Sequence, residues 1–232
     1  MNWKSTILIW LILSLLVACD EPDDRDTTVT DIDGNIYQTV VIGEQEWMAE
    51  NLKVTHYRNG DTIPNISIEG DWIGTTSGAL CYYDNLIGNV DTCGALYNWY
   101  TVDDSRGLAP EGWHIPTDSE WKELEIYLGI SPSDADSLNY RGTTEGDLLK
   151  SVSGWLNDGN GNNESGFTAL PCGYRSSGGS GFGSMGRWAG FPSSSPKDNS
   201  YIWGRILFDD SHTIYRAYTG REVGFSVRCI KD

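Results

Sequence analysis

Gly112-Trp113-His114-Ile115-Pro116-Thr117-Asp118-Ser119-Glu120-Trp121 is the stretch around which the rest of this chain is organised. Pro116 favours an extended conformation for the residue before it and cannot itself lie in a helix interior. Thr117 is a good N-cap, and Glu120 stands three residues later, which is the pattern of a capping box. With the apolar spacing that follows, the stretch predicts an extended arm that turns into a helix over 117–128.

The segments before this stretch predict mainly strands. Asp33-Gly34 is a tight-turn dipeptide between strand-forming residues and predicts a hairpin. Residues 37–42 and 45–54 predict the next two strands, because they combine β-branched and apolar side chains. Aromatic residues recur at helical spacing over 94–103, so we expect a second helix there.

The segments after it predict strands and one long loop. Residues 200–209 and 213–218 predict a strand pair, and 224–230 alternates apolar with polar side chains as a closing strand does. By contrast, residues 173–190 contain seven glycines. Because glycine disfavours regular structure, we expect a long loop that is ordered only where its aromatic rings pack.

Residues 1–18 have the composition of a cleaved export signal. Lys4 precedes an almost unbroken apolar run over 7–17, which is too short to cross a bilayer comfortably as a helix. The run ends in Leu16-Val17-Ala18-Cys19, which resembles the lipobox of bacterial lipoproteins and implies that Cys19 carries the lipid. A plain secretory signal or an uncleaved anchor is the alternative, and both also export the chain.

Residues 19–30 are acidic and nearly free of apolar side chains, which predicts a flexible tether. An acidic cluster directly after Cys19 resembles the surface-export signal of lipoproteins in the Bacteroidetes, and an ordinary solvated linker is the alternative. The whole chain has a formal net charge of −17. Because such a surface repels nucleic acid and anionic headgroups, we expect no nucleic-acid partner and attachment to the membrane through the lipid alone.

Four cysteines follow the leader, and they are Cys81, Cys93, Cys172 and Cys229. An even number in an exported domain predicts two disulfides, for which three pairings exist. A zinc site is the alternative, but the chain has no Cys-x-x-Cys and the spacings do not suit one.

Six segments, taken in order, carry a resemblance to one family. They are Asp31-Ile32-Asp33-Gly34-Asn35-Ile36-Tyr37, Trp47-Met48-Ala49-Glu50-Asn51-Leu52, Gly94-Ala95-Leu96-Tyr97-Asn98-Trp99, the stretch at 112–121, Gly166-Phe167-Thr168-Ala169-Leu170-Pro171 with Gly173-Tyr174-Arg175, and Gly224-Phe225-Ser226-Val227-Arg228-Cys229. The series resembles the Fibrobacter succinogenes major paralogous domain, which occurs in lipoproteins of Bacteroidetes and Fibrobacteres. The resemblance extends over residues 31–232, which we treat as one domain.

That family is similar, more weakly, to the formylglycine-generating (sulfatase-modifying) superfamily, whose fold is an elaborated C-type lectin-like domain. The segments at 115–121 and 224–229 carry this second likeness. It implies an α+β fold in which two helices pack on a small twisted antiparallel sheet, with long Gly-rich loops on one side. The helices expected over 94–103 and 117–128 fit this architecture.

The sequence departs from the family at two of its cysteines. Cys93 stands where a Tyr is usual, and Cys172 stands where a Gly is usual. Against the family pattern, this suggests that Cys93 and Cys172 bond each other and that Cys81 pairs with Cys229. The rival pairing, Cys81 with Cys93, closes a short local loop and stays open.

The superfamily likeness also raises an enzymatic function, since formylglycine-generating enzymes bind copper through a late pair of cysteines. Here the Gly-rich segment 175–182 contains no Cys, and Cys229 matches a structural Cys at the end of the superfamily pattern. His114 lies in the arm before the helix and is interpreted as a packing residue, and no motif marks a catalytic pair of carboxylates. We therefore expect no catalysis, and an enzyme of altered chemistry on the same fold is the alternative.

The polar loop at 158–164 suggests a cation site. Oxygen-bearing side chains alternate along it, and they are Asp158, Asn160, Asn162 and Glu164. Calcium prefers several oxygen ligands of this kind, so calcium is the cofactor that the loop could hold. The alternative is a turn-rich loop whose Asn and Asp side chains cap its own backbone.

The supply of aromatic residues points to a binding function. Four tryptophans lie in expected helices and strands and are predicted core residues, namely Trp47, Trp99, Trp113 and Trp121. The Gly-rich segment holds a predicted ligand-binding set that comprises Tyr174, Arg175, Phe182, Arg187 and Trp188. Aromatic faces stack on sugar rings and anchor protein interfaces. The alternative is that these rings only pin the loop to the domain.

These features combine into one functional hypothesis. The sequence predicts an outer-membrane lipoprotein of the cell envelope, exposed at the cell surface. Its single domain is expected to be a non-catalytic binding or structural module, with a polysaccharide or a surface protein as partner.

Overall fold

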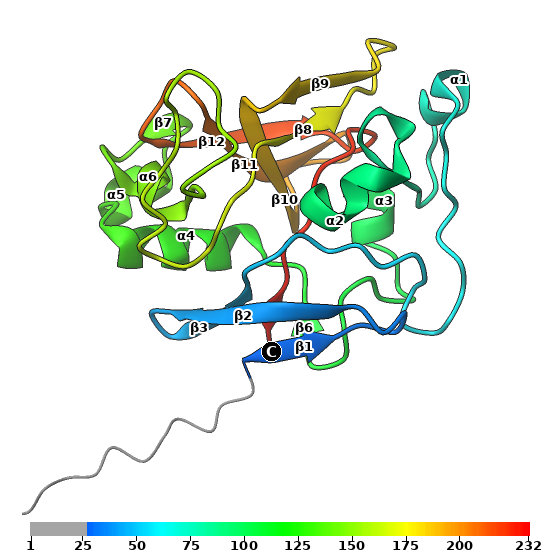
Figure 1. The fold of residues 1–232 in the computed structure, drawn as a ribbon, viewed down its shortest axis with the longest axis horizontal. Helices are drawn as coiled ribbons and strands as arrows, with labels where there is room; N and C mark the ends of the chain where they lie inside the picture. The colour runs from blue at the N-terminus through cyan, green and yellow to red at the C-terminus, as the bar shows by residue number, and fades with distance from the viewer. Residues whose placement is uncertain (1–26) are drawn as a thin grey trace, which may run out of the picture.

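The computed structural model describes residues 27–232 of the chain. The expected signal peptide over 1–18, the lipid-bearing Cys19 and most of the expected tether lie outside these residues. The described part is mostly β, with short helices and two curled, largely antiparallel sheets. Figure 1 shows the smaller sheet at one end of the molecule, beside the C-terminus, and the larger sheet at the other end.

The smaller sheet has five strands in the order β1-β2-β3-β13-β6. Their bounds are Thr28–Thr30 for β1, Ile36–Ile42 for β2, Gln45–Met48 for β3, Trp113–His114 for β6 and Ile230–Lys231 for β13. The expected hairpin is confirmed, because β1 pairs antiparallel with β2 and Gly34 has the positive φ of 82° that favours glycine. Residues 28–30, which were expected in the tether, are strand instead, since Val29 pairs with Tyr37 and its neighbours also favour extended backbone.

The larger sheet has six strands in the order β7-β12-β11-β10-β8-β9. Their bounds are Asn139–Arg141 for β7, Cys172–Arg175 for β8, Phe182–Met185 for β9, Trp188–Pro196 for β10, Tyr201–Phe208 for β11 and Ile214–Gly220 for β12. The expected pairing of two late strands is confirmed, because β11 and β12 are antiparallel neighbours.

The prediction of a long loop over 173–190 is wrong. This segment forms β8, β9 and the start of β10, with β8 and β9 paired antiparallel. Its glycines permit close packing inside the sheet: a Cβ atom at Gly190 would lie 2.5 Å from the ring of Phe225. Glycine is therefore required here by a neighbouring side chain, which the composition of the segment alone does not reveal.

The longest described helix is α4, which runs over Asp118–Leu128 and is capped as expected. Thr117 Oγ1 accepts a hydrogen bond from the backbone N–H of Glu120, and the Glu120 carboxylate accepts one from the backbone N–H of Thr117. The other elements are short: α1 Glu69–Trp72, α2 Val90–Cys93, α3 Trp99–Val102, α5 Pro132–Ala135, α6 Glu145–Leu149, the 3₁₀ turns η1 Tyr83–Asn85 and η2 Ile87–Asn89, and a separate strand pair of β4 Leu80–Cys81 and β5 Leu96–Tyr97.

The prediction of a helix over 94–103 is wrong for the first half of the segment. Tyr97 is extended, since its backbone exchanges hydrogen bonds with that of Phe225. Asn98 then begins α3 by accepting a hydrogen bond from the Thr101 backbone N–H. A long-range backbone pairing therefore overrides the helical spacing of the aromatic side chains.

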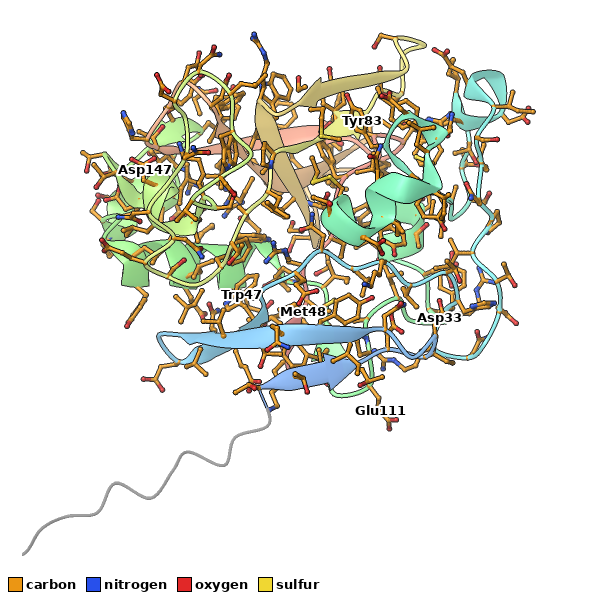
Figure 2. All side chains as sticks on the ribbon, viewed as in Figure 1. Asp33, Trp47, Met48, Tyr83, Glu111 and Asp147 are labelled. Atoms are coloured by element: carbon orange, nitrogen blue, oxygen red, sulfur yellow. A yellow bond between two sulfur atoms is a disulfide. The ribbon has the colours of Figure 1, made fainter. Side chains whose placement is uncertain are left out.

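An aromatic cluster fills the space between the sheets and α4. The rings of Trp47, on β3, and Trp121, on α4, have centroids 4.9 Å apart, and Phe167 and Phe191 contact them. Figure 2 shows Trp47 and its neighbour Met48 between the smaller sheet and the rest of the domain. All four tryptophans predicted for the core are buried. Each buried side chain of this size stabilises the fold by roughly 1.5–3 kcal/mol through loss of contact with water.

Buried ion pairs hold α4 to the larger sheet. Asp118 accepts hydrogen bonds at 2.7 Å from both Arg205 and Arg216, and Glu125 accepts them from Arg141 at 2.6 Å and from Arg205 at 2.5 Å. Burial alone raises the pKa of Asp118, but the guanidinium groups of Arg216 and Arg205 outweigh it and hold that pKa below its ordinary value. These ion pairs join α4 to β7, β11 and β12 and so orient the helix on the sheet. Losing one member is costly, because it leaves another charge buried with fewer partners.

Candidate functional site

Two of the five predicted ligand-binding residues form an aromatic pair at the surface of the larger sheet. The rings of Tyr174, on β8, and Trp188, at the start of β10, are stacked with centroids 5.3 Å apart and 21° between their planes. Both side chains are half-buried. Arg187 directly precedes Trp188 and is exposed. These three residues therefore lie together as predicted.

Arg175 and Phe182 lie on the opposite face of the β8–β9 hairpin, because side chains alternate along a strand. Arg175 is only 1% exposed; its guanidinium donates a hydrogen bond to the Ile66 carbonyl at 2.6 Å and lies over the ring of Trp72. Phe182 packs against the ring of Tyr83 with centroids 5.3 Å apart. These two side chains hold the hairpin to the domain, so the structure does not bring all five predicted residues to one surface.

Three further rings extend the Tyr174–Trp188 pair into a continuous row. The ring centroid of Phe208, on β11, lies 5.1 Å from that of Trp188, and Tyr215, on β12, lies 5.5 Å from Phe208. Tyr140, on β7, lies 4.8 Å from Tyr215 and 5.8 Å from Phe208, so these three rings contact one another. Five adjacent strands thus contribute one ring each, and we call these five side chains the aromatic row.

Strand register places the row on one face of the larger sheet. Tyr215 is paired with Tyr140 on one side and with Ile206 on the other. Phe208 shares the face of Ile206, which stands two residues earlier, and Phe208 is itself paired with Trp188. The opposite face of β11 contacts α4 through the buried ion pairs.

The aromatic row is a surface feature that becomes more exposed toward β7. Tyr140 is 58% exposed, and the other four rings are half-buried. At the other end, Phe225 lies 6.3 Å from Tyr174 and is 7% exposed, so the row ends where the sheet becomes covered. The five rings lie outside the three buried hydrophobic clusters of the described chain. Such rings can stack on sugar rings or anchor a partner protein.

The loop predicted to bind calcium borders the aromatic row. Asn157 donates a hydrogen bond at 2.6 Å to the carboxylate of Asp209, whose backbone N–H donates to the carbonyl of Arg187. Asp209 directly follows Phe208, and Arg187 directly precedes Trp188. The loop therefore lies at the ends of β10 and β11, beside two rings of the row.

The predicted calcium ligands are mainly engaged within the loop. Asn160 Oδ1 accepts a hydrogen bond from the Trp155 backbone N–H at 3.1 Å, and Asn162 Oδ1 accepts one from the Glu164 backbone N–H at 3.2 Å. The Asn162 amide donates to the Glu164 carboxylate at 2.9 Å, and Asp158 is exposed. The described part of the chain holds no group of three or more His, Cys, Asp or Glu side chains placed for a metal ion. These contacts are those of self-capped turns, and calcium binding stays a prediction.

Of the two predicted disulfides, the one between Cys93 and Cys172 is present, with Cα atoms 5.5 Å apart. It joins α2 to β8 two residues before Tyr174. The predicted bond between Cys81 and Cys229 is wrong, because within residues 27–232 both are free and buried. The two thiols belong to different hydrophobic clusters, which keeps them apart.

The free thiols are poorly suited to chemistry. Burial raises the pKa of the Cys81 thiol to about 11, and burial also raises the pKa of the Cys229 thiol above its ordinary value. Nucleophilic and redox-active cysteines need exposure and a lowered pKa. Neither residue meets these conditions.

His114 contacts two carboxylates. Its Nδ1 lies 2.7 Å from Asp232, and its Nε2 lies 2.8 Å from Glu120, the residue that also caps α4. Burial alone lowers the pKa of His114, but the hydrogen bonds with Asp232 and Glu120 outweigh it and raise that pKa above its ordinary value. Both ring nitrogens are engaged, which fits the packing role expected for this residue.

The other two histidines, His56 and His212, each contact one carboxylate. His56 Nδ1 lies 2.6 Å from Asp33 beside a cavity of about 410 Å³, and His212 Nδ1 lies 2.6 Å from Asp147. The second carboxylate oxygen of Asp33 accepts hydrogen bonds from the backbone and hydroxyl of Thr55. These contacts orient the turn that carries Asp33.

Sequence reasoning missed Tyr140, Phe208 and Tyr215. Phe208 and Tyr215 lie in segments that were correctly predicted as paired strands, so their shared face was in principle available from strand alternation. Tyr140 lies outside the segments predicted as strands and gave no such signal. The pairing of β7 with β12, which brings Tyr140 beside Tyr215, is visible only in the structure.

The fold and the site define a mostly β domain that is stapled by a disulfide and carries an aromatic surface. The chain belongs to the family described as the Fibrobacter succinogenes major domain, whose model matches residues 40–231. None of the curated proteins and none of the solved structures compared with the chain matches it. In the described part, no helix has the length and apolar character needed to cross a membrane.

Proposed function

We propose that this chain is a cell-envelope lipoprotein whose domain binds a polysaccharide or a surface protein and catalyses no reaction. A lipid on Cys19 anchors it in the outer membrane, with the domain facing the cell exterior. The observation that carries the binding function is the aromatic row, in which five partly exposed rings contact one another outside the buried clusters.

The position of the aromatic row suits an anchored binding domain. In Figure 1, the strand β1, where the described chain begins, lies at the opposite end of the molecule from β8 and β12. Cys19 precedes Thr27 by eight positions, so this connection spans at most about 28 Å when fully extended. A lipid on Cys19 would keep β1 near the bilayer and leave the row on the distant side.

The domain fold is proposed to be a variant of the C-type lectin-like, sulfatase-modifying fold. Two features support this: the extended arm of β6 that leads through the capping box into α4, and the C-terminal segment that packs against β3. In that segment Arg228 is buried and donates hydrogen bonds to the carbonyls of Met48 and Thr168. Superposition of an experimental structure on a formylglycine-generating enzyme tests this relation.

The alternative of an altered enzyme has less support. The copper-binding chemistry of the related superfamily uses paired reactive cysteines, whereas the free thiols here are buried and have raised pKa values. Thiol titration of the folded protein tests this alternative. Rapid reaction of Cys81 or Cys229 without denaturant would favour the enzyme hypothesis over the binding function.

Binding is tested with the chain from which residues 1–18 are removed and in which Cys19 is replaced by Ser, so that the protein is soluble. An array of polysaccharides and purified surface proteins is probed with this chain and with its Trp188→Ala variant. At least one partner is expected to bind the soluble Cys19→Ser chain, and to bind its Trp188→Ala variant about tenfold more weakly. An array without any partner that depends on Trp188 would overturn the proposal.

Anchoring is tested separately in cells. The natural chain is expected in the outer-membrane fraction, carrying a lipid on Cys19 and accessible to protease added outside intact cells. The Cys19→Ala variant is expected to lose the lipid and leave the membrane fraction. An unlipidated mature chain that stays in the membrane would contradict this part of the proposal.

A further inference from the structure

We infer that the ligand of the aromatic row is a neutral polysaccharide that crosses the strands of the larger sheet, from Tyr174 to Tyr140. This inference rests on the binding function proposed above and names its ligand. It follows from the spacing of the rings, from the pairing of the backbone hydrogen-bonding groups beneath them and from the charge around them.

The spacing of the rings suits a chain of sugar units. One ring comes from each of β8, β10, β11, β12 and β7, in that order across the sheet. Successive rings lie about 5 Å apart from Tyr174 to Phe208, and Tyr140 lies 5.8 Å from Phe208, so the row extends over at most about 16 Å. The spacing between successive rings is comparable to the size of one hexose ring. The row can therefore meet about three sugar units of a linear chain that lies across the strands, with Phe208, Tyr215 and Tyr140 together at one end.

The backbone beneath the aromatic row disfavours an extended peptide as ligand. Peptides that join a sheet do so along an edge strand, where unpaired N–H and C=O groups are available. The central rings Trp188, Phe208 and Tyr215 belong to strands that are paired on both sides. A ligand on this face can use only side chains, and aromatic faces bind the apolar face of a sugar ring.

The hydroxyl groups of the aromatic row provide polar contacts beside the rings. Tyr140 and Tyr215 each carry a phenol, and the Tyr215 hydroxyl already donates a hydrogen bond at 2.9 Å to Asn139, which leaves its oxygen able to accept another. Arg187 is exposed beside Trp188, and its guanidinium has no partner among the described residues. These groups match the alternating donors and acceptors of a sugar chain.

The charge around the aromatic row favours a neutral ligand over an anionic one. The five ring positions carry no ionisable acid or base other than the three phenols of tyrosine. Carboxylates border the row in the neighbouring loop and after β11, at Asp158, Asp209 and Asp210. Arg187 is the exposed cation beside the row, since the ammonium of Lys150 is buried and paired with Asp147. With a net chain charge of −17, this border repels uronic-acid and sulfated chains at ordinary ionic strength.

The experiment compares neutral with anionic polysaccharides in one format. Isothermal titration and affinity electrophoresis are run on the soluble Cys19→Ser chain with glucomannan, mixed-linkage glucan and xylan as neutral probes, and with polygalacturonate as the anionic probe. A neutral probe is expected to bind at least about tenfold more tightly than polygalacturonate. In a series of oligosaccharides from that probe, affinity is expected to rise with length up to about three units, which is the length that the row can contact.

Matched variants locate the site. Trp188→Ala and Tyr140→Ala are each expected to weaken binding about tenfold, whereas Trp188→Phe, which retains a ring, is expected to weaken it less. Tyr140 is largely exposed, so its removal leaves the fold intact. Tyr127→Ala is the control, because Tyr127 is 65% exposed on α4 and lies outside the row. It is expected to leave binding unchanged.

The outcomes separate the inference from the proposed function. Tighter binding of polygalacturonate, or Trp188-dependent binding of a protein alone, overturns the inference and leaves the binding function standing. No binding that depends on Trp188 or Tyr140, or an equal loss in Tyr127→Ala, overturns both. Affinity that stops rising at two sugar units overturns the alignment of the ligand across the strands.

Discussion

Cys93 and Cys172 are joined by a disulfide across 79 residues of sequence, and their bond ties α2 to the first residue of β8. Both sulfur atoms belong to buried side chains. Tyr174, at one end of the aromatic row, stands two residues further along the same strand. The bond therefore restrains the strand that carries one end of the candidate binding surface.

Loss of this disulfide is expected to destabilise the domain substantially. A bridge that closes a loop of this length contributes roughly 4 kcal/mol in the chain-entropy model. The Cys93→Ser, Cys172→Ser double variant is expected to show this loss in urea unfolding. The assignment of the disulfide is checked by counting reactive thiols. Without reductant, two thiols of the soluble Cys19→Ser chain are expected to react in urea, and four are expected to react after reduction. Four reactive thiols before reduction would contradict the assignment.

Removal of one carboxylate from the buried ion network is expected to be costly. In Glu125→Gln, the guanidinium of Arg141 loses its carboxylate partner while it stays buried, and that of Arg205 retains only Asp118. The free energy of unfolding is expected to fall by about 3–5 kcal/mol. Glu123→Gln on the exposed side of the same helix is the control and is expected to change it by less than about 0.5 kcal/mol. Equal effects of the two variants would refute a special role for the network.

The capping box of α4 makes a smaller contribution. Thr117→Ala removes the hydroxyl that accepts the Glu120 N–H and is expected to cost about 1 kcal/mol in thermal or urea unfolding. Thr117→Ser keeps the hydroxyl and is expected to restore most of the loss. A serine variant that is as unstable as the alanine variant would show that the methyl group, and not the cap, is responsible.

The stability of the domain is expected to depend on pH through His114. The contacts with Asp232 and Glu120 raise the pKa of His114 in the folded state above its unfolded value of about 6.5. Its contribution is therefore fully present below that unfolded value and is lost as pH rises through the higher folded pKa. His114→Gln is expected to flatten the decline in stability over this window.

The matched control for this pH dependence is His212→Gln. The side chain of His212 is 73% exposed and contacts one carboxylate, that of Asp147. It is the exposed histidine against which the effect of His114→Gln on the pH profile of unfolding is compared. A profile that changes as much in this variant as in His114→Gln would show that His114 has no particular part in it.

The parts of the fold that were predicted correctly depend on local signals. The turn at Asp33-Gly34 and the cap formed by Thr117 and Glu120 each use residues within a few positions of one another, so the sequence contains the whole interaction. The helix expected over 94–103 failed because the backbone of Tyr97 pairs with that of Phe225, which is far away in the chain. No local pattern reports such a pairing.

The candidate site was predicted in part for the same reason. Tyr174, Arg187 and Trp188 were selected because they lie in one segment, and they remain together in the structure. Arg175 and Phe182 lie in that segment too, but strand alternation places them on the other face. A segment expected to be a loop gave no basis for separating the two faces.

The sequence by itself determined the family, the capped helix, the first hairpin and the late strand pair, since these follow from local chemistry and from the order of short motifs. Only the tertiary structure decided which thiols bond and which rings share a surface. Cys81 and Cys229 stay apart because they pack into separate clusters, and Tyr140 joins the aromatic row because β7 pairs with β12. Both outcomes depend on which distant segments pack together, and that is decided by the burial of the whole chain.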